Sequence, residues 1–390
     1  MKKRVAVLGV TGSIGASTLD VLRRGREDFE LVFLSGHTGA GRLLALGREF
    51  PGALLALSGK DPRDGSGLSE EDRGKIAYFG KEGLLRGIAE CGAHITVNGI
   101  AGAAGLEPSL AAIKAGSDLA LANKETVVLA FPLVAALAEK KQVRILPVDS
   151  EHAAVFKLLE AHGKEPVEEV LLTASGGPFR GYTPERLAAV TPREALAHPT
   201  WNMGPKISVD SATLANKGLE VIEAVRLFDL PKDGVKVVIH PQSIVHSMIR
   251  LKNGAIYAQM SRPDMRLPIH DALYWPHTVL SPFGTLDFEA LNLEFEKPDY
   301  RNFPLLSLAY DVAGAGGLYP AAYNAANEVA VAAFLEERIE FLDIPRIVEY
   351  VLRGDWNTPS PDLETILDAD KRARKAALLQ AALYMTEKNA

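Results

Sequence analysis

Residues 3–24, KRVAVLGVTGSIGASTLDVLRR, decide the fold of the N-terminal part of the chain. Lys3 to Leu8 is a near-continuous apolar run, which predicts a buried strand, and Ser17 to Arg24 has helical spacing. The turn between them has glycine at every third position, from Gly9 to Gly15. Glycines let a backbone approach a pyrophosphate, and a helix N-terminus offers N–H groups to it. We interpret the stretch as a dinucleotide-binding turn; the alternative is that the glycines only form a tight turn.

The alternation of strand and helix continues outward from this turn. Residues 108–114 have helical spacing, and short apolar runs predict strands at residues 31–34, 53–57, 94–97, 119–122 and 144–148. Strands that alternate with helices are typical of a parallel sheet covered on both faces. We expect an α/β fold in which residues 1–149 form a Rossmann-like, doubly wound parallel sheet that binds the nucleotide.

The pattern changes after Ser150, where we expect an α+β catalytic domain over residues 150–274. Residues 210–228 have helical spacing, and the strands are expected at residues 169–173, 235–239, 244–251 and 255–260. The last two strands form an antiparallel pair, because Asn253-Gly254 between them is a hairpin turn sequence.

A long loop and a helical region complete the expected organisation. Residues 175–205 are rich in glycine and proline and have one short helical pattern, at 185–189, which is typical of a lid or binding loop. A linker over residues 275–300 leads to a C-terminal α-helical domain, residues 301–390, with helices expected at residues 325–337 and 370–388.

Length and composition exclude several classes of protein. At roughly 150 residues per domain, 390 residues predict two or three packed units. The 43 Lys and Arg against 49 Asp and Glu give a net charge of −6, which argues against a nucleic-acid-binding protein. The longest apolar stretch, Thr126 to Ala138, is shorter than the roughly 20 residues that span a bilayer. Because Cys91 is the single cysteine and the N-terminus does not resemble an export signal, we expect a cytoplasmic protein with no membrane or nucleic-acid partner.

The end of the second predicted strand favours NADP over NAD. An NAD site normally has Asp or Glu at this point, where it accepts the ribose 2′-hydroxyl. Here Gly36, His37 and Thr38 follow the strand, and Arg42 lies just beyond. No carboxylate is present to repel a 2′-phosphate, and imidazole, hydroxyl and guanidinium donors are nearby. The alternative is that His37 and Arg42 are solvated loop residues.

Two groups of acidic residues predict a metal site. Asp149 and Glu151 follow a predicted parallel strand, and in extended backbone residues i and i+2 point the same way, so both carboxylates could face one cation. In the helix predicted at 210–228, Asn216 and Glu220 share a face, with Lys217 beside them. Three carboxylates would select a hard ion such as Mg²⁺ or Mn²⁺. The alternatives are a solvated strand end and an exposed salt-bridged helix face.

The long loop carries residues that could cover a ligand. Ser175-Gly176-Gly177 lies near one end, and His198, Trp201 and Met203 lie near the other. Glycines can serve as hinges, while Trp and Met exclude water. The alternative is that Trp201 anchors the loop on the core. His152 and His246 could support the site, although a lone His is more often simply hydrogen-bonded in place.

The ordered motifs resemble those of the 1-deoxy-D-xylulose 5-phosphate reductoisomerase family. They span nearly the whole chain and read GVTGSIG, LANKE, PVDSEH, TASGGPF, HPTWNMG, KISVDSAT, NKGLE, HPQSIVHS and NAANEVA. The resemblance implies NADPH- and metal-dependent rearrangement and reduction of 1-deoxy-D-xylulose 5-phosphate to 2-C-methyl-D-erythritol 4-phosphate, in the non-mevalonate isoprenoid pathway. It also implies a homodimer, and Mg²⁺, Mn²⁺ or Co²⁺ as the metal ion.

The resemblance further assigns roles to residues at the matching positions. The metal ligands are Asp149, Glu151 and Glu220. The catalytic residues are Lys124, Glu151 and His198. The substrate contacts are Ser150, Glu151, Ser175, His198, Trp201, Ser211, Asn216, Lys217 and Glu220, of which Ser175, Ser211, Asn216 and Lys217 form the phosphate site. The cofactor contacts are Thr11, Gly12, Ser13, Ile14, Gly36, His37, Thr38, Asn123, Glu125, Met203 and Gly204.

One departure and two alternatives accompany the resemblance. Some family members have Gly-Lys-Asn where this chain has Gly36-His37-Thr38, so a lysine expected at the 2′-phosphate is absent. A semialdehyde dehydrogenase would share the nucleotide domain but needs a thiol nucleophile, for which Cys91 is the single candidate. A non-catalytic NADP-binding sensor would keep the fold without needing the three carboxylates.

Overall fold

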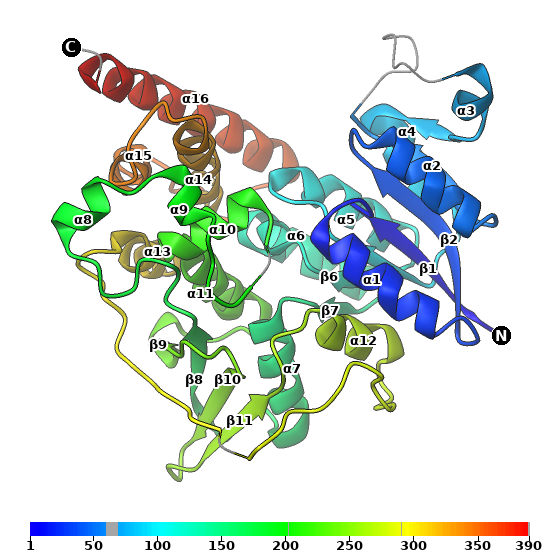
Figure 1. Ribbon diagram of the computed structural model, residues 1–390, viewed down its shortest axis with the longest axis horizontal. Helices are drawn as coiled ribbons and strands as arrows, with labels where there is room; N and C mark the ends of the chain where they lie inside the picture. The colour runs from blue at the N-terminus through cyan, green and yellow to red at the C-terminus, as the bar shows by residue number, and fades with distance from the viewer. Residues whose placement is uncertain (60–68, 202, 290, 389–390) are drawn as a thin grey trace. The chain divides into compact units, whose positions relative to one another are not determined.

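The computed structural model describes residues 1–59, 69–201, 203–289 and 291–388, and they form two compact units (Figure 1). Unit 1 comprises residues 1–126, 133–153 and 264–284, and unit 2 comprises residues 127–132, 154–263 and 285–390. The four-part division expected from the sequence has other boundaries and stays a prediction. None of the described helices has the length and apolar character that a membrane crossing requires.

Unit 1 contains a seven-stranded sheet in the order β4-β3-β2-β1-β5-β6-β7, in which all neighbouring strands are parallel. Its strands are β1 (Lys3–Leu8), β2 (Phe29–Gly36), β3 (Leu54–Leu57), β4 (Tyr78–Phe79), β5 (Ile95–Asn98), β6 (Asp118–Leu121) and β7 (Ile145–Pro147). The predicted α/β class and parallel sheet are confirmed. The two-residue edge strand β4 was not predicted, because it is too short to show a hydrophobic pattern.

Helices alternate with these strands in the chain. They are α1 (Ser13–Arg24), α2 (Ala40–Glu49), α3 (Glu70–Gly74), α4 (Gly80–Glu90), α5 (Leu106–Lys114), α6 (Lys124–Lys141) and the first residues of α7 (Ser150–His162). Leu19, Val21 and Leu22 of α1 are almost fully buried, as the apolar stripe of an amphipathic helix requires. A short 3-10 turn, Ala103–Gly105, precedes α5.

A helix from much later in the sequence completes unit 1. Helix α12 (Arg266–Tyr274) packs on α1 and near β6 and β7. Its Tyr274 ring lies 4.8 Å from the ring of Phe29 and its hydroxyl donates to Asp28, while Arg266 pairs with Asp20 at 2.6 Å. The N-terminal sheet therefore has part of its cover supplied by residues 264–284.

Unit 2 contains a mixed four-stranded sheet in the order β11-β10-β8-β9. The strands are β8 (Val167–Ala174), β9 (Val235–Ile239), β10 (Val245–Leu251) and β11 (Ile256–Met260). Strands β10 and β11 are antiparallel, as the Asn253-Gly254 turn predicts, and Gly254 has a φ of +86°. Strand β8 pairs antiparallel with β10 and parallel with β9.

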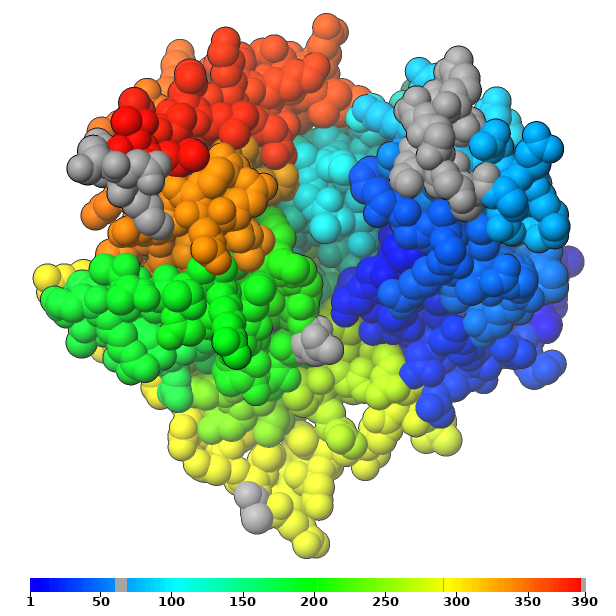
Figure 2. Space-filling view, turned by 45° about the horizontal axis from the view of Figure 1, so that its top comes forward, coloured from blue at the N-terminus to red at the C-terminus, as the bar shows by residue number. Residues whose placement is uncertain are grey.

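The helices of unit 2 pack on this sheet and on one another. They are α8 (Pro184–Ala188), α9 (Pro192–Ala195), α10 (Pro205–Ala212), α11 (Ala215–Leu227), α13 (Pro304–Ala315), α14 (Tyr319–Leu335), α15 (Asp343–Leu352) and α16 (Leu363–Lys388), with a 3-10 turn at Lys232–Gly234. Figure 2 shows α16, in red, lying on the α14 and α15 region, in orange. The Trp275–Pro276 peptide bond, in the expected linker, is cis.

The structure corrects the single helix expected over residues 210–228. Helix α10 ends at Ala212 and α11 begins at Ala215, because Leu214 has a φ of +58° in the left-handed region. Helical spacing on both sides of a two-residue break looks continuous in the sequence, which is why the break was missed.

Candidate active site

The glycine-rich turn of unit 1 lies where the strand order reverses, between β1 and β5. Gly9 has a φ of +73°, and a Cβ atom there would lie 2.8 Å from the carbonyl oxygen of Gly99. A Cβ atom at Gly15 would lie 2.4 Å from the Cα atom of Val10. Both positions therefore exclude a side chain. The turn is bare backbone at the point where open α/β sheets bind their ligands.

The N-terminus of α1 opens onto this turn. Its N-cap is Gly12, and no side chain in the described part of the chain caps it. The first-turn N–H groups and the positive end of the helix dipole are thus available to an anion. The predicted contacts Thr11, Gly12, Ser13 and Ile14 lie in the turn or the first turn of α1. This cradle fits the pyrophosphate of a dinucleotide.

Polar side chains gather at the carboxyl end of β2, where Gly36, His37 and Thr38 were predicted to meet the cofactor. Arg42 Nη1 donates to the carbonyl of Thr11 at 2.8 Å, and His37 Nδ1 lies 3.1 Å from Ser58 Oγ. Ser58 was not predicted from the sequence. Ser58 directly follows β3, and Leu57 of β3 pairs with Gly36 of β2. The sequence signal for Ser58 was its position at the end of the strand next to β2. The group offers imidazole, hydroxyl and guanidinium donors.

Asn123 and Glu125 lie at the carboxyl edge of the same sheet, after β6. The Asn123 side chain caps α6, and its Nδ2 donates to the carbonyls of Ile100 and Gly102 at 2.7 and 2.9 Å. It also donates to Glu125 Oε2 at 2.9 Å. These bonds fix the loop that follows β5 against the first turn of α6. Asn123 and Glu125 are thereby held beside the switch point of the sheet, at a place where a dinucleotide can reach them.

Lys124 and Asp149 meet because their strands are neighbours. Leu121 of β6 pairs with Pro147 of β7, so the residues that follow them emerge side by side. Lys124 Nζ lies 2.5 Å from Asp149 Oδ2, and both side chains are largely buried. Burial would raise the pKa of Asp149, but the Lys124 ammonium and His152 outweigh it and hold that pKa well below its ordinary value. The carboxylate is therefore charged at neutral pH.

The extended geometry expected for Asp149 and Glu151 is wrong. Ser150 begins α7, and the amide of Ala153 donates to the carbonyl of Asp149 at 2.8 Å, so Asp149 lies at the helix start and Glu151 in its first turn. Ser150 Oγ donates to Glu151 Oε2. The strand β7 ends at Pro147 and α7 begins at Ser150, whereas the sequence predicted that the extended strand continues through Glu151. Two-residue alternation is therefore not what brings the two carboxylates together, but an oxygen of each lies within 4.8 Å of the other.

In unit 2, four predicted substrate contacts lie around the break between α10 and α11. Ser211 is near the end of α10, and Asn216 and Lys217 occupy the first turn of α11. Ser175 follows β8, and a Cβ atom at Gly177, two residues later, would lie 2.5 Å from the carbonyl oxygen of Ser211. Gly177 thus allows the two backbones to touch, a role that the sequence did not indicate.

Glu220 lies one turn further along α11, buried with 1% of its surface exposed. Asn216 Nδ2 donates to Glu220 Oε1 at 2.5 Å, and Lys217 Nζ donates to Glu220 Oε2. Lys217 is also buried. The spacing of three and four residues predicted this common face, and the structure confirms that these three side chains meet.

His198 connects the far end of the loop with Ser175. Its Nδ1 accepts the backbone N–H groups of Thr200 and Trp201 at 3.1 and 2.9 Å. In the neutral ring the proton is then on Nε2, which donates to Ser175 Oγ at 2.9 Å. Burial lowers the pKa of His198, which favours this neutral form. A substrate phosphate at Ser175 would therefore be within reach of the imidazole.

The rest of the loop is only partly covered by the structure. The half-buried Trp201 ring lies 6.4 Å from the ring of His246, whose Nε2 lies 2.9 Å from Ser261 Oγ. Met203 is half-buried, and the exposed Gly204 is the N-cap of α10. Asn202, within the HPTWNMG motif, is outside the described residues. The roles of Trp201, Met203 and Gly204 toward ligands stay predictions.

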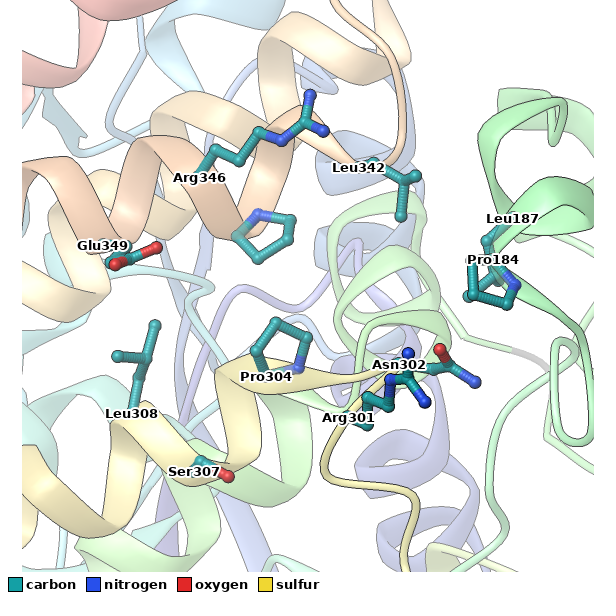
Figure 3. A pocket seen from close by; sticks show the side chains of 11 residues that line it. Pro184, Leu187, Arg301, Asn302, Pro304, Ser307, Leu308, Leu342, Arg346 and Glu349 are labelled. Carbon is teal, nitrogen blue, oxygen red and sulfur yellow. The ribbon is translucent and has the colours of Figure 1, made fainter.

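A separate cavity of about 500 Å³ lies in unit 2 between α8, α13 and α15 (Figure 3). Pro184, Leu187, Leu308 and Leu342 contribute apolar walls, and Arg301 is among its polar residues. None of the predicted site residues lines it. The cavity is therefore distinct from the groups described above.

The fold and the glycine cradle place the chain in the class of dinucleotide-dependent oxidoreductases of the α/β type. Family descriptions match three segments: 1-deoxy-D-xylulose 5-phosphate reductoisomerase at residues 5–130, its C-terminal domain at 145–228, and the DXP reductoisomerase C-terminal domain at 260–376. Within that class, the chain belongs to the 1-deoxy-D-xylulose 5-phosphate reductoisomerase family.

Individual relatives agree over the full length. The chain is 49% identical to the 1-deoxy-D-xylulose 5-phosphate reductoisomerase of Treponema pallidum and 46% identical to that of Nostoc punctiforme, in each case over 96% of both chains. Among solved structures, the reductoisomerase of Zymomonas mobilis in complex with NADPH is 41% identical, with a TM-score of 0.88 over 99% of both chains. Another, in complex with NADPH, fosmidomycin and magnesium, is 39% identical, with a TM-score of 0.90 over 98% of both chains.

Proposed function

We propose that Asp149, Glu151 and Glu220 hold one divalent metal ion in the reaction of this family. That reaction is the NADPH- and metal-dependent conversion of 1-deoxy-D-xylulose 5-phosphate to 2-C-methyl-D-erythritol 4-phosphate, in the non-mevalonate pathway to isoprenoid precursors. The chain is an NADP-dependent oxidoreductase, and its cofactors are NADPH and a divalent metal ion. Relatives have been solved in complexes with NADPH and with magnesium.

One observation carries the metal assignment: in unit 1, carboxylate oxygens of Asp149 and Glu151 lie within 4.8 Å of each other, close enough to share one ion. Asp149 pairs with Lys124 in unit 1, and Glu220 pairs with Lys217 in unit 2. The lysines are the positive partners of these carboxylates in the chain itself, and an all-oxygen set of ligands suits Mg²⁺ or Mn²⁺. A bound ion of this kind supplies electrostatic stabilisation of negative charge on the substrate oxygens.

The phosphate of the substrate is proposed to bind where α11 begins. Asn216 and Lys217 lie in the first turn of this helix. Its N-cap residue, Leu214, makes no capping hydrogen bond through its side chain, and Thr213 Oγ1 accepts from the N–H of Ala215. The helix dipole and the Lys217 ammonium both favour an anion there. Ser175, Ser211 and His198 add hydrogen-bonding groups within the same unit. These residues bind and orient the phosphate end of the substrate.

The remaining residues act at the reacting end. Lys124 brings a buried ammonium close to the carboxylate of Asp149, where it can stabilise developing negative charge on a substrate oxygen. Trp201 and Met203 are proposed to cover the substrate and exclude water. NADPH, bound at the glycine cradle, supplies the hydride. Asn123 and Glu125 are proposed to hold the nicotinamide ribose in place.

Removal of the metal tests this proposal directly. The purified chain is expected to oxidise NADPH when 1-deoxy-D-xylulose 5-phosphate and Mn²⁺ are present, to lose turnover in excess EDTA, and to regain it when Mn²⁺ or Mg²⁺ is restored. The loss of nicotinamide absorbance measures the rate. Turnover that continues unchanged in EDTA would contradict the metal assignment, and the absence of turnover with metal present would contradict the activity.

Cofactor selectivity gives a second test. The variant His37→Asp is expected to lower kcat/KM for NADPH by at least about tenfold and to lower that for NADH much less, because a carboxylate at the end of β2 repels the 2′-phosphate. His37→Asn, similar in size and uncharged, is the matched control and should keep the preference for NADPH. Wild-type efficiency that is equal with NADPH and NADH would refute the selectivity.

Neither alternative activity is favoured. A semialdehyde dehydrogenase needs a reactive thiol, but Cys91 is 3% exposed, its Sγ lies 3.3 Å from the carbonyl of Ile88, and burial raises the pKa of its thiol. A cofactor sensor would not need the buried carboxylate and ammonium pairs. The family resemblance further leads us to propose a homodimer, which light scattering measures, and the single buried cysteine suits a cytoplasmic location.

A further inference from the structure

Helix α6 is broken near its middle. Ala130 has φ −143° and ψ 25°, which is not helical, and Pro132 follows two residues later. Proline has no N–H group, so the carbonyl of Val128, four residues earlier, lacks its usual helical donor. Residues 124–129 therefore form a short helical segment with a C-terminus of its own. Val127 to Ala130 are almost fully buried, so water does not readily replace the missing donor.

Arg226, in the last turn of α11, supplies that donor. Its Nη1 donates to the carbonyl oxygen of Val128 at 2.7 Å and to that of Val127 at 3.3 Å. All three residues belong to unit 2. The guanidinium thus lies at the negative end of the dipole of the short segment. Burial lowers the pKa of Arg226 to about 10, so the group is still charged at neutral pH.

The choice of arginine is not explained by an ion pair. No carboxylate in the described part of the chain forms a salt bridge with Arg226. Burial therefore removes the guanidinium from water, and its hydrogen bonds are made to carbonyl groups instead. The two carbonyls share one nitrogen of the guanidinium, Nη1, and a charged donor of this kind binds carbonyl oxygens more strongly than a neutral donor does. The contact therefore sets the direction of the segment that ends at Val128.

The two helices joined by this contact carry the reacting groups. Lys124 and Glu125 begin the short segment of α6, about 6 Å along the axis from Val128. Glu220 lies about 9 Å along α11 from Arg226, with Lys217 one turn before it. Helices are stiff over such lengths, so a shift at Arg226 is passed on to these side chains. A misplacement of about 1 Å can cost an enzyme on the order of 100-fold in rate.

We propose that Arg226 is a positioning residue for the reaction: by fixing the end of the short segment at Val128, it sets the direction in which that segment presents Lys124. It acts through Lys124 and does not itself touch the substrate. The inference rests on the proposed function, because it requires Lys124 to act on the substrate.

The variants Arg226→Met and Arg226→Gln test the proposal. Met keeps the length of the side chain without a donor, and Gln keeps a neutral donor. In both we expect kcat to fall between about 10- and 100-fold, with the dissociation constants of NADPH and of the substrate each changed by no more than about threefold. Arg226→Lys keeps the charge with a single donor group, so it should recover part of the lost kcat.

Arg4→Met is the matched control. Arg4 Nη2 donates at 2.7 Å to the carbonyl of Cys91, which is the C-cap of α4, so this variant also removes a guanidinium from a helix end. It should lower thermal stability and leave kcat within about twofold of the wild-type value.

Three results would overturn the proposal. They are a kcat within twofold of wild type in both neutral variants, a weakening of both dissociation constants as large as the loss of kcat, and an equal loss of kcat in Arg4→Met. If the neutral variants do not fold, Arg226→Lys decides: an unchanged kcat refutes the proposal, and a several-fold loss with unchanged dissociation constants supports it. A wild-type chain without turnover would instead refute the proposed function.

Discussion

Replacing Glu220 by glutamine is expected to lower kcat by at least about 100-fold, with little change in the fold. Glutamine keeps the volume and one oxygen of the side chain, and its amide can still accept from Lys217. It lacks the charge that a divalent ion requires, so metal affinity falls along with turnover. Steady-state rates measured as a function of Mn²⁺ concentration separate the two effects: added metal should recover part of the loss.

A second acid on the same helix provides the control for this variant. Glu223 is also buried with 1% exposure, lies three residues further along α11, and was not predicted to be a ligand. Glu223→Gln should therefore keep the metal dependence of the wild type. Wild-type rates in Glu220→Gln, or the same loss of metal affinity in Glu223→Gln, would show that the ligand set is wrong.

Replacing Lys124 by methionine is expected to lower kcat between about 100- and 1,000-fold, the range seen when a group that stabilises transition-state charge is removed. Lys124→Arg should retain more of the activity, because it keeps the positive charge. Lys3→Met, in the same unit, removes a half-buried ammonium that donates to the carbonyl of Leu273 at 2.6 Å and should leave kcat nearly unchanged. If both methionine variants lost the same amount of kcat, the cause would be a less stable unit 1 and not the loss of the Lys124 charge.

The Lys124 variant also has a predictable pH dependence of stability. In the wild type the pKa of Asp149 is depressed, so its ionised form stabilises the folded state above the ordinary Asp pKa of about 4, and this contribution is lost as the pH falls. Without Lys124 the buried Asp149 destabilises the folded state at neutral pH. The difference in Tm between the two proteins should therefore narrow as the pH is lowered below about 4, where the wild type loses the contribution of its ionised Asp149. A constant difference would contradict the role of the pair.

The parts of the fold that the sequence predicts correctly depend on local patterns. The β1–turn–α1 unit follows from an apolar run, spaced glycines and a helical stretch, and the β10–β11 hairpin follows from Asn253-Gly254. The break at Leu214 has no such pattern, because leucine rarely adopts a positive φ. The break in α6 is also hard to see in the sequence: the stretch from Thr126 to Ala138 is mostly apolar throughout, and only Pro132 marks the kink.

The candidate site divides in the same way. Asn216, Lys217 and Glu220 were predicted together because three- and four-residue spacing is a property of one helix. Asp149 and Lys124 meet because β6 and β7 are paired. This pairing joins residues that are distant in the sequence, so the order of the motifs does not predict it. Ser58 is found only once β3 is known to lie beside β2. The steric role of Gly177 emerges only where two backbones come within contact distance.

The position of α12 in unit 1 has a consequence for the order in which the protein is made. Strand β1 leaves the ribosome early, but the helix that covers Phe29 and pairs with Asp20 begins at Arg266, after residues 154–263 of unit 2 have been synthesised. During synthesis, the nucleotide-binding sheet therefore keeps this apolar flank uncovered until residues 264–284 have been made. Unit 1 therefore cannot complete its fold before much of unit 2 has been synthesised, and a fragment that ends at Asp149 would lack helix α12.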